Sequence, residues 1–338
     1  MGVRAIFFVR TAFRPGAAFT TRAALFLMVL SGLPGTANAQ DLAPLVAQCA
    51  SGGSPELLVP CQSAVLAAQA VRGGVVLAHG AGTHLSGASS TIGRRLGSSP
   101  RVSVGLRFRM TRFEMPDILG EPTGTVGQNA VNEYTTEASL AVGIFDGFSL
   151  MPTVGGILSL DLLASGSLTF LGESDGFLGN KSAVSLGGRL GIFRESFSLP
   201  GVTVSATRSY GQRVDWSSGG SGTQIDTDVS TTSVRAIIGK DFFTMAVLAG
   251  MGWDWNEGEM GVRVPDPTII GGLGIGRMDD LTTRRTIYFA GVSITRLVFQ
   301  FSLEAGWAGG YDGLPGYSGA YDPASVTPFV SVAGRLTI

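Results

Sequence analysis

Two arginines in the stretch 100–114 stand at alternate positions of an otherwise apolar run. Arg107 and Arg109 flank a phenylalanine, and no acidic residue lies close to them in the sequence. The even positions carry apolar side chains: Val102, Val104, Leu106, Phe108 and Met110. Because successive side chains of a strand point to opposite faces, the two arginines lie on one face and the apolar residues on the other. Guanidinium groups gathered on one face pair with carboxylates or bind anions, so this strand needs a polar surrounding on one side and an apolar one on the other.

The same alternation places isolated charges on the polar faces of later strands. A hairpin between 100–114 and 130–145 would bring Glu137 opposite Arg107. We predict that these charges face a shared interior and form one network: Arg107, Arg109, Glu133, Glu137, Asp161, Arg189, Arg235, Glu304 and Arg335. Two interpretations remain open. The charges either pair and keep a narrow barrel rigid, or they form a constriction that selects solutes.

Histidine, the usual general base, occurs only as His79 and His84, both before the first predicted strand. No carboxylate or cysteine close in sequence completes a zinc site with them. The run "GGLGIG" at 271–276 lacks the strand-then-helix context of a dinucleotide site, and we interpret it as a flexible loop. We therefore expect no enzyme activity, no metal and no cofactor.

The first 39 residues predict a secretory signal peptide. Four arginines and no acidic residue accompany the apolar run 23–33, and "ANA" at 37–39 forms a small-residue cleavage site after Ala39. The apolar run is too short for a transmembrane anchor, which needs about 20 residues. Export to the periplasm follows from this interpretation.

The remaining chain is acidic and apolar in a dispersed way. Without residues 1–39, 20 basic residues face 25 acidic ones, a net charge of about −5, which argues against nucleic acid as a partner. Mean hydropathy is +0.31 with 14% charged residues. Since no segment beyond residue 39 offers 18 uninterrupted apolar residues, the sequence favours strands over membrane helices.

Residues 40–99 differ from the rest and predict a periplasmic helical or plug segment. Ser54 and Pro55 mark a helix start, and an Ala-rich helix over 60–71 is expected to stop at Gly73-Gly74. Cys49 and Cys61 are expected to form a disulfide in an oxidising compartment. The Gly/Ser-rich remainder either enters the barrel or is a solvated linker, and the helix could also cap the mouth.

From residue 100 to 338, one pattern repeats: a run of period two followed by a turn. We predict ten strands, each long enough to cross a membrane. They cover about 100–114, 130–145, 154–171, 182–193, 201–216, 226–239, 242–256, 283–295, 297–309 and 325–338. Long and short connections alternate, as between the two sides of an outer membrane. Twelve strands are the alternative, if 257–281 adds a hairpin.

On this pattern, residues 100–338 resemble the bacterial outer-membrane β-barrel proteins, and segment 40–99 resembles the N-terminal hatch of the outer-membrane fatty-acid transporters. The resemblance implies an all-β transmembrane antiparallel barrel in the bacterial outer membrane. It also implies contact with lipid, lipopolysaccharide and the barrel-insertion machinery, and a monomer. Trp253, Trp255 and Trp307 are expected in an interfacial aromatic girdle. The chain departs from the usual aromatic C-terminus by ending on Ile338.

Two segments are candidate binding loops. Acidic residues in 254–281 would share divalent cations with lipopolysaccharide, and Tyr311, Tyr317 and Tyr321 would stack on a ligand or lie among head groups. For both segments, a plain hydrated surface loop is the favoured interpretation. For function, the sequence favours passage of a small or amphiphilic solute through a narrow or plugged barrel. A non-conducting barrel that acts through its loops is the alternative.

Overall fold

The chain forms a closed antiparallel barrel of ten strands, as expected, rather than twelve. The computed structural model describes residues 41–93, 99–119, 126–148, 157–196 and 199–338. The strands are β1 (Val102–Pro116), β2 (Gln128–Phe145), β3 (Ser159–Phe170), β4 (Lys181–Phe193), β5 (Gly201–Ser217), β6 (Gln224–Phe242), β7 (Met245–Pro265), β8 (Leu273–Arg296), β9 (Phe299–Ala308) and β10 (Thr327–Thr337). The predicted signal peptide, 1–39, lies outside the described residues.

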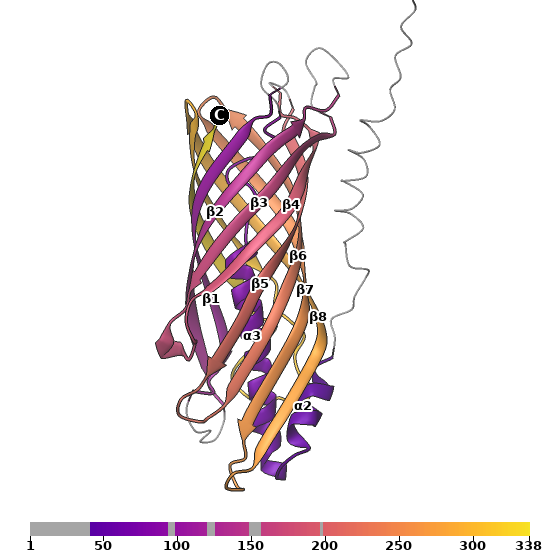
Figure 1. The fold of residues 1–338 in the computed structure, drawn as a ribbon, viewed down its shortest axis with the longest axis vertical. Helices are drawn as coiled ribbons and strands as arrows, with labels where there is room; N and C mark the ends of the chain where they lie inside the picture. Colours follow the sequence, from indigo (N-terminus) through magenta and orange to yellow (C-terminus); the bar gives the residue numbers. More distant parts are fainter. Residues whose placement is uncertain (1–40, 94–98, 120–125, 149–156, 197–198) are drawn as a thin grey trace, which may run out of the picture. The chain divides into compact units, whose positions relative to one another are not determined.

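Each strand pairs with its neighbours in the sequence, and β1 pairs with β10 to close the barrel (Figure 1). The predicted register of the first hairpin is confirmed, because Arg107 lies opposite Glu137. Closure brings the start of β1 beside the C-terminus, where the Val102 amide donates to the carbonyl of Ile338 at 3.1 Å. No edge strand is left unpaired in this sheet, so the backbone groups of the strands are satisfied within the barrel.

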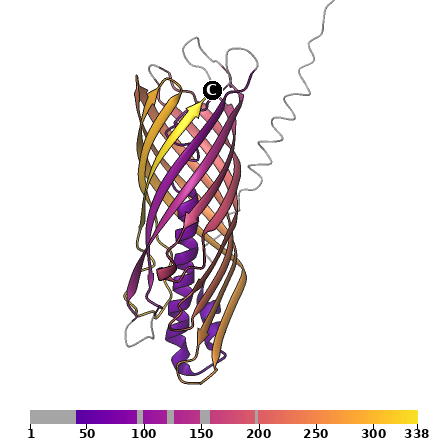
Figure 2. The ribbon, with the colours of Figure 1, turned by 60° about the vertical axis from the view of Figure 1, so that its left-hand side comes forward.

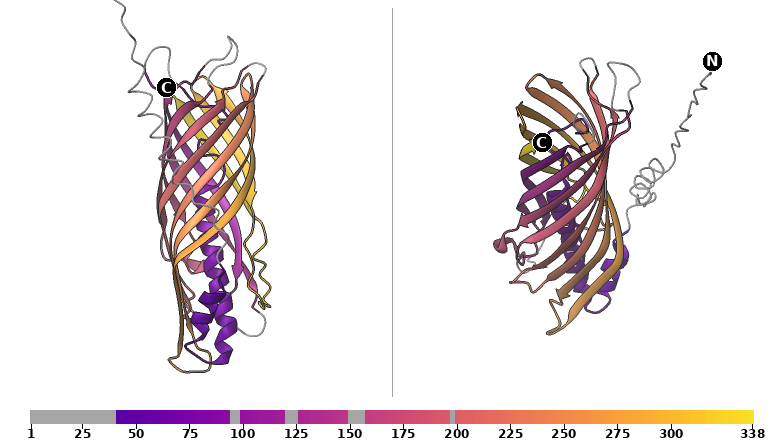
Figure 3. Two further views of the ribbon diagram at one scale, coloured as in Figure 1. Left: turned by 90° about the vertical axis from the view of Figure 1, so that its right-hand side faces the viewer. Right: turned by 45° about the horizontal axis from the view of Figure 1, so that its top comes forward.

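Between residue 41 and the barrel, the structure describes three helical elements: α2 (Ala43–Ala50), the 3-10 turn η1 (Pro55–Leu57) and α3 (Leu58–Gly80). The disulfide between Cys49 and Cys61 is confirmed and joins α2 to α3. Helix α3 lies inside the barrel in every view (Figures 2 and 3). Residues 55–80 form one helical stretch long and apolar enough to cross a membrane, but 94% of its most apolar window is buried within the barrel.

The expected stop of this helix at Gly73-Gly74 is wrong, since α3 continues to Gly80. Both glycines lie against large rings: a Cβ at Gly73 would clash with the ring of Tyr311, and one at Gly74 with the ring of Phe113. The glycine pair therefore allows the helix to approach the barrel wall closely. It costs some helix propensity, and packing inside the barrel offsets that cost.

The segment 257–281 is neither a long loop nor an extra hairpin. It lengthens β7 and β8, which are joined only by residues 266–272, and "GGLGIG" contributes to β8 rather than to a flexible loop. Here the alternation is reversed. Apolar residues such as Met260, Val262 and Leu281 are buried inside, while charged ones such as Glu259 and Arg277 point outward and are exposed.

The barrel thus has two halves with opposite polarity. In the part we call the belt half, apolar side chains point outward and polar ones inward; outward examples are Val104, Leu106, Phe108, Val184, Leu186, Val292, Phe301, Leu303 and Val332. In the extended half, the ends of β5 to β8 that lie farthest from the C-terminus, polar side chains point outward. Its apolar interior packs on α2, η1 and the first part of α3 as one core.

Candidate functional site

The candidate site is the polar interior of the belt half, where the end of α3 and the loop 81–93 meet inward side chains of the barrel. We call α3 together with residues 81–93 the plug. All nine charged residues of the predicted network point into the barrel. Six of them contact the plug, which the sequence did not indicate. Two ion pairs also form within the network, Arg109 with Glu137 and Arg189 with Asp161.

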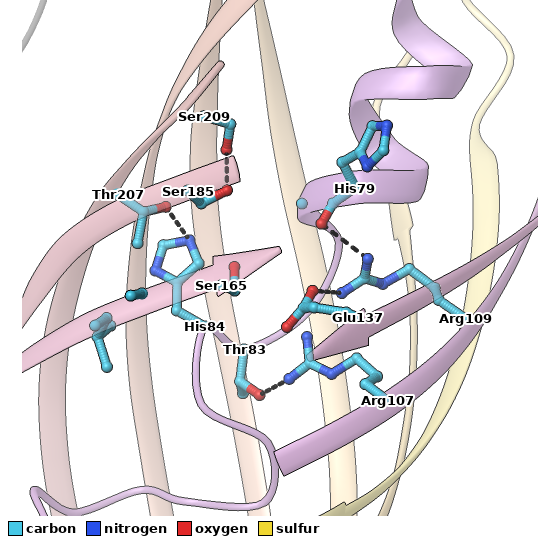
Figure 4. A pocket seen from close by; sticks show the side chains of 13 residues that line it. His79, Thr83, His84, Arg107, Arg109, Glu137, Ser165, Ser185, Thr207 and Ser209 are labelled. Atoms are coloured by element: carbon cyan, nitrogen blue, oxygen red, sulfur yellow. Dashed lines mark hydrogen bonds and ion pairs between the residues drawn. The ribbon is translucent and has the colours of Figure 1, made fainter. Parts of the chain in front are cut away.

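Two arginines from different strands bind the carboxyl end of α3. Figure 4 shows the first of them, Arg109, beside His79. Arg109 of β1 donates to the carbonyls of Ala78 and His79, the latter at 2.9 Å. Arg235 of β6 donates to the carbonyl of Gly80 at 2.9 Å and to that of Gly82 at 3.2 Å. The last carbonyls of a helix lack intrahelical partners and carry partial negative charge, so two cations there satisfy both needs.

Each of these arginines is also paired with a carboxylate. Arg109 forms an ion pair with Glu137 at 3.1 Å, on the diagonal of the β1–β2 register, instead of Arg107, which lies directly opposite. Arg235 pairs with Asp254 at 2.7 Å. All four side chains are at most 7% exposed, so each charge is compensated inside the barrel.

The loop 81–93 is held by hydrogen bonds with side chains of several strands, among them β1, β3 and β9. Glu304 of β9 accepts from the amides of Thr83 and Gly87, both at 3.1 Å, and from the Thr83 hydroxyl at 2.5 Å. Arg107 donates to the hydroxyls of Thr83 and Ser86. Nearer the C-terminal end, Asp161 pairs with Arg189 at 2.7 Å and accepts from the amide of Ile92 at 3.0 Å.

Both histidines of the chain belong to the plug, and each contacts two hydroxyls of one strand. His79 lies 2.7 Å from Ser167 Oγ and 3.4 Å from Thr169 Oγ1 on β3. His84 lies 2.9 Å from Ser205 Oγ and 3.1 Å from Thr207 Oγ1 on β5. The two ring nitrogens of each imidazole are thereby occupied, so the geometry gives both histidines a docking role.

Two predicted members stand apart from this network. Both carboxylate oxygens of Glu133 are buried, and within the described part of the chain they accept no hydrogen bond. Arg335 donates to Gln300, but its Nε and Nη1 contact no acceptor among those residues. Arg335 lines a cavity of about 210 Å³ at the C-terminal end of the barrel. Between the histidines, Arg107, Arg109 and Glu137, only about 20 Å³ is free, which is room for a single water molecule.

The first candidate binding loop is wrong, because most of 254–281 belongs to β7 and β8. The second, 309–323, is a connection between β9 and β10, as expected. Asp254, placed in a loop by the sequence, is inside the barrel with Arg235. Asp266 accepts from the Ser54 amide at 2.6 Å and from the Thr268 amide at 2.8 Å, so it joins η1 to the β7–β8 connection. These hydrogen bonds keep the pKa of Asp266 below its ordinary range, because they stabilise the carboxylate form.

The tyrosines of 309–323 close the extended half instead of facing solvent. Tyr321 is buried and Tyr317 packs against the same core as α3. Tyr311 lies under the guanidinium of Arg285, 4.7 Å from its ring centre. Arg285 was not predicted; it also donates to the carbonyl of Gly73 at 3.1 Å and so fixes the middle of α3. It lies within the predicted strand 283–295, but the next inward residues there, Ile287 and Phe289, are apolar, so the alternation did not mark Arg285 as facing a polar interior.

The three tryptophans point outward near the border between the two halves. Trp307 is 50% exposed and packs on Tyr288, with ring centres 6.0 Å apart. Trp255 lies beneath Arg284 at 5.7 Å. Tyr134 and Tyr210, each at least half exposed, point outward on β2 and β5. Aromatic side chains with a polar edge are typical of this border in a membrane.

No family model matches the chain, and no curated protein matches its sequence. Among solved structures, the outer-membrane protease OmpT from Escherichia coli is 12% identical with a TM-score of 0.39, covering 74% of this chain and 100% of that one. The translocator domain of the autotransporter NalP from Neisseria meningitidis is 11% identical with a TM-score of 0.32, covering 71% and 88%. The Pseudomonas putida toluene transporter TodX is 10% identical with a TM-score of 0.30, covering 75% and 95%.

These similarities concern the barrel alone. The fold is a closed antiparallel β-barrel of ten strands. Within the described ranges, no three His, Cys, Asp or Glu side chains gather in a way that could hold a metal ion. What the inward side chains do here is bind the chain's own plug, through helix-end carbonyls, loop amides and hydroxyls.

Proposed function

We propose that the protein is an outer-membrane barrel closed by its own plug, which does not conduct in the state described and acts through the extended half. The observation that carries this proposal is the apolar seal of that half. Leu57, Val65, Leu66, Val71 and Val75 are each 0% exposed and share one core with the barrel wall. A pore that opened readily would need a weaker seal.

The cost of opening supports the closed state. Burying a large aliphatic side chain stabilises by about 1.5–3 kcal/mol, so withdrawing these five residues would cost roughly 8–15 kcal/mol. That is comparable to the whole stability of a typical domain. Thermal motion would populate such an open state to a negligible extent.

The belt half supports a placement in the membrane. Its outward apolar side chains suit hydrocarbon, and Trp253, Trp255 and Trp307 lie where an interfacial girdle is expected. We propose that this surface contacts lipid, with lipopolysaccharide near the tryptophans, and that the barrel works as a monomer assembled by the insertion machinery. The short two-residue turns at 243–244 and 297–298 would face the periplasm, since periplasmic turns are the short ones. The proposed role involves no catalysis, because both histidines serve to hold the plug.

A gated passage for a small solute is the second candidate, and the belt half favours it. There the loop 81–93 is held mainly by hydrogen bonds and ion pairs, and it borders the 210 Å³ cavity beside Arg335. Polar contacts of this kind exchange with water more readily than an apolar core does.

Planar-bilayer recordings distinguish the two candidates. We expect the purified wild-type protein to be silent, and the double variant R109Q/R235Q, which loses both clamps on the end of α3, to stay silent because the apolar seal remains. Conductance steps in the double variant, with a wild type that is silent, would favour the gated passage. Steps in the wild type itself would contradict the closed state. Heat-modifiable gel mobility checks that each barrel is folded.

A further inference from the structure

The path of the chain places residues 41–57 at the end of the barrel farthest from the C-terminus. The amide of Arg277 donates to the side chain of Gln48 at 2.8 Å, and Ser54 is bonded to Asp266. Both partners belong to the far ends of β7 and β8 or to their connection. The segment before the barrel is therefore attached to the extended half.

Strand β1 begins at the opposite end, beside Ile338. The chain between these points runs through the lumen: α3 enters from the extended half, and its last residues meet Arg109 and Arg235 in the belt half. The loop then continues to Ile92, which is bonded to Asp161. The N-terminal segment thus crosses the barrel once, lengthwise and from within.

We propose that the barrel carries its own N-terminal segment across the outer membrane and displays residues 41–57 on the cell surface. This inference rests on the proposed membrane orientation, in which the end with two-residue turns faces the periplasm. It differs from the sequence-based expectation that the whole of 40–99 is periplasmic, because only its last part lies at the C-terminal end.

The geometry also bears on the order of assembly. The lumen holds one helix, α3, along its length, whereas α2 and α3 lie side by side at the far end, joined by the disulfide (Figure 1). A disulfide-linked pair of helices is wider than the single helix that the wall encloses. The barrel therefore closes around α3, or α2 folds and the disulfide forms after the segment has passed through.

The displayed segment is built to stay folded outside the cell. The disulfide closes a loop of 12 residues, and Asp266 binds the start of η1 with both the amide and the hydroxyl of Ser54. A covalent link of this size stabilises by about 2–3 kcal/mol and persists in oxidising surroundings. The surface so formed consists of α2, η1 and the β7–β8 connection.

Two single cysteines first test the orientation in intact cells. I270C places a thiol at a fully exposed position of the β7–β8 connection, and F243C places one in a turn at the other end. A membrane-impermeant maleimide is expected to label I270C in intact cells, and F243C only after the outer membrane is permeabilised. The reverse pattern would overturn the orientation, and with it both the proposed placement and this inference.

A protease site inserted between Gly52 and Gly53, in the exposed turn after α2, then tests the path of the chain. We expect added protease to cleave it in intact cells, whereas the same site inserted between Phe243 and Thr244 should be cleaved only after permeabilisation. Protection of the 52–53 site in cells where I270C is labelled would refute surface display and leave the orientation intact. Extracts confirm that each inserted site is cleavable when the protein is unfolded.

Discussion

The belt half and the extended half of this barrel enclose the same plug, but their outer faces and interiors have opposite polarity. In the belt half, the outer face is apolar and the interior holds ion pairs, hydroxyls and the polar part of the plug. In the extended half, the outer face carries pairs such as Arg277 with Glu259 and Asp279, and the interior is an apolar core around α3. The change occurs within single strands, near Trp255 and Tyr288.

The difference shows that a strand's polarity follows its surroundings rather than its place in the sheet. Where lipid covers the wall, the apolar side chains point outward, so the alternate polar side chains point inward. Their hydrogen-bonding groups must then find partners inside the barrel. Where water covers it, the wall packs on a helix like any soluble domain. The plug passes through both halves, and its first part is apolar while its last part is polar.

The largest expected effect concerns the ion pairs inside the belt half. R235A would leave Asp254 buried and unpaired and would free the carbonyls of Gly80 and Gly82. Removing one partner of a buried ion pair costs about 3–5 kcal/mol. We expect the free energy of unfolding in lipid vesicles, measured with urea, to fall by that amount. R263Q, at an exposed position, is the control and should change it by less than about 0.5 kcal/mol.

An equal result for R235A and R263Q would mean that the ion pairs of the belt half add little to stability, and that the apolar core alone holds the plug. The two halves would then differ in how much each stabilises the plug as well as in the chemistry of their interiors.

The next largest effect concerns the apolar core of the extended half. L66A removes a side chain that is 0% exposed, and such deletions cost about 2–5 kcal/mol. We expect limited proteolysis to cut within the plug at lower urea concentration in L66A. L58A, on the same helix but 45% exposed, is the matched control. Equal sensitivity of the two variants would contradict the assignment of the seal to this core.

The sequence predicted the belt half well because lipid imposes a regular pattern. Alternation of apolar and polar residues located β1 and β10, and it placed Arg107 opposite Glu137 in the correct register. Simple counting of strands with this pattern also gave the closed barrel of ten. Each of these features depends on neighbours along one strand or hairpin.

The extended half was missed because its pattern depends on partners far away in the sequence. Met260 and Val262 pack in one core with α2 and α3, and the residues next to them in the sequence do not indicate this contact. Gly74 lies within α3 instead of ending it, and the ring of Phe113 packs so close that only a glycine fits there. Similarly, Glu137 pairs with Arg109 rather than Arg107 because Arg109 also binds the end of α3, a contact across the lumen.

The disulfide provides a smaller effect that is specific to the extended half. C49S/C61S removes a link worth about 2–3 kcal/mol for a loop of this length. Hydrogen exchange should increase in α2 and at the start of α3, while amides of β1 and β10 in the belt half remain protected. Faster exchange throughout the barrel would show that the two halves unfold as one unit.

The smallest expected effect is a pH dependence at Asp266, which lies in the connection beyond the extended strands. Its pKa is lowered in the folded state because the amides of Ser54 and Thr268 donate to the carboxylate. The stabilisation is therefore complete above the unfolded pKa of about 3.9, and it is lost as the pH falls through the lower folded value.

Exchange of the Ser54 amide should therefore speed up below about pH 4 in the wild type, relative to an amide of the belt half measured in the same sample. D266N keeps one acceptor oxygen but cannot titrate, so it should show no such acid-dependent change. If the wild type and D266N respond to acid alike, Asp266 does not join η1 to the β7–β8 connection. The extended half would then depend on its apolar core and disulfide alone, and the attachment of residues 41–57 would lose its polar component.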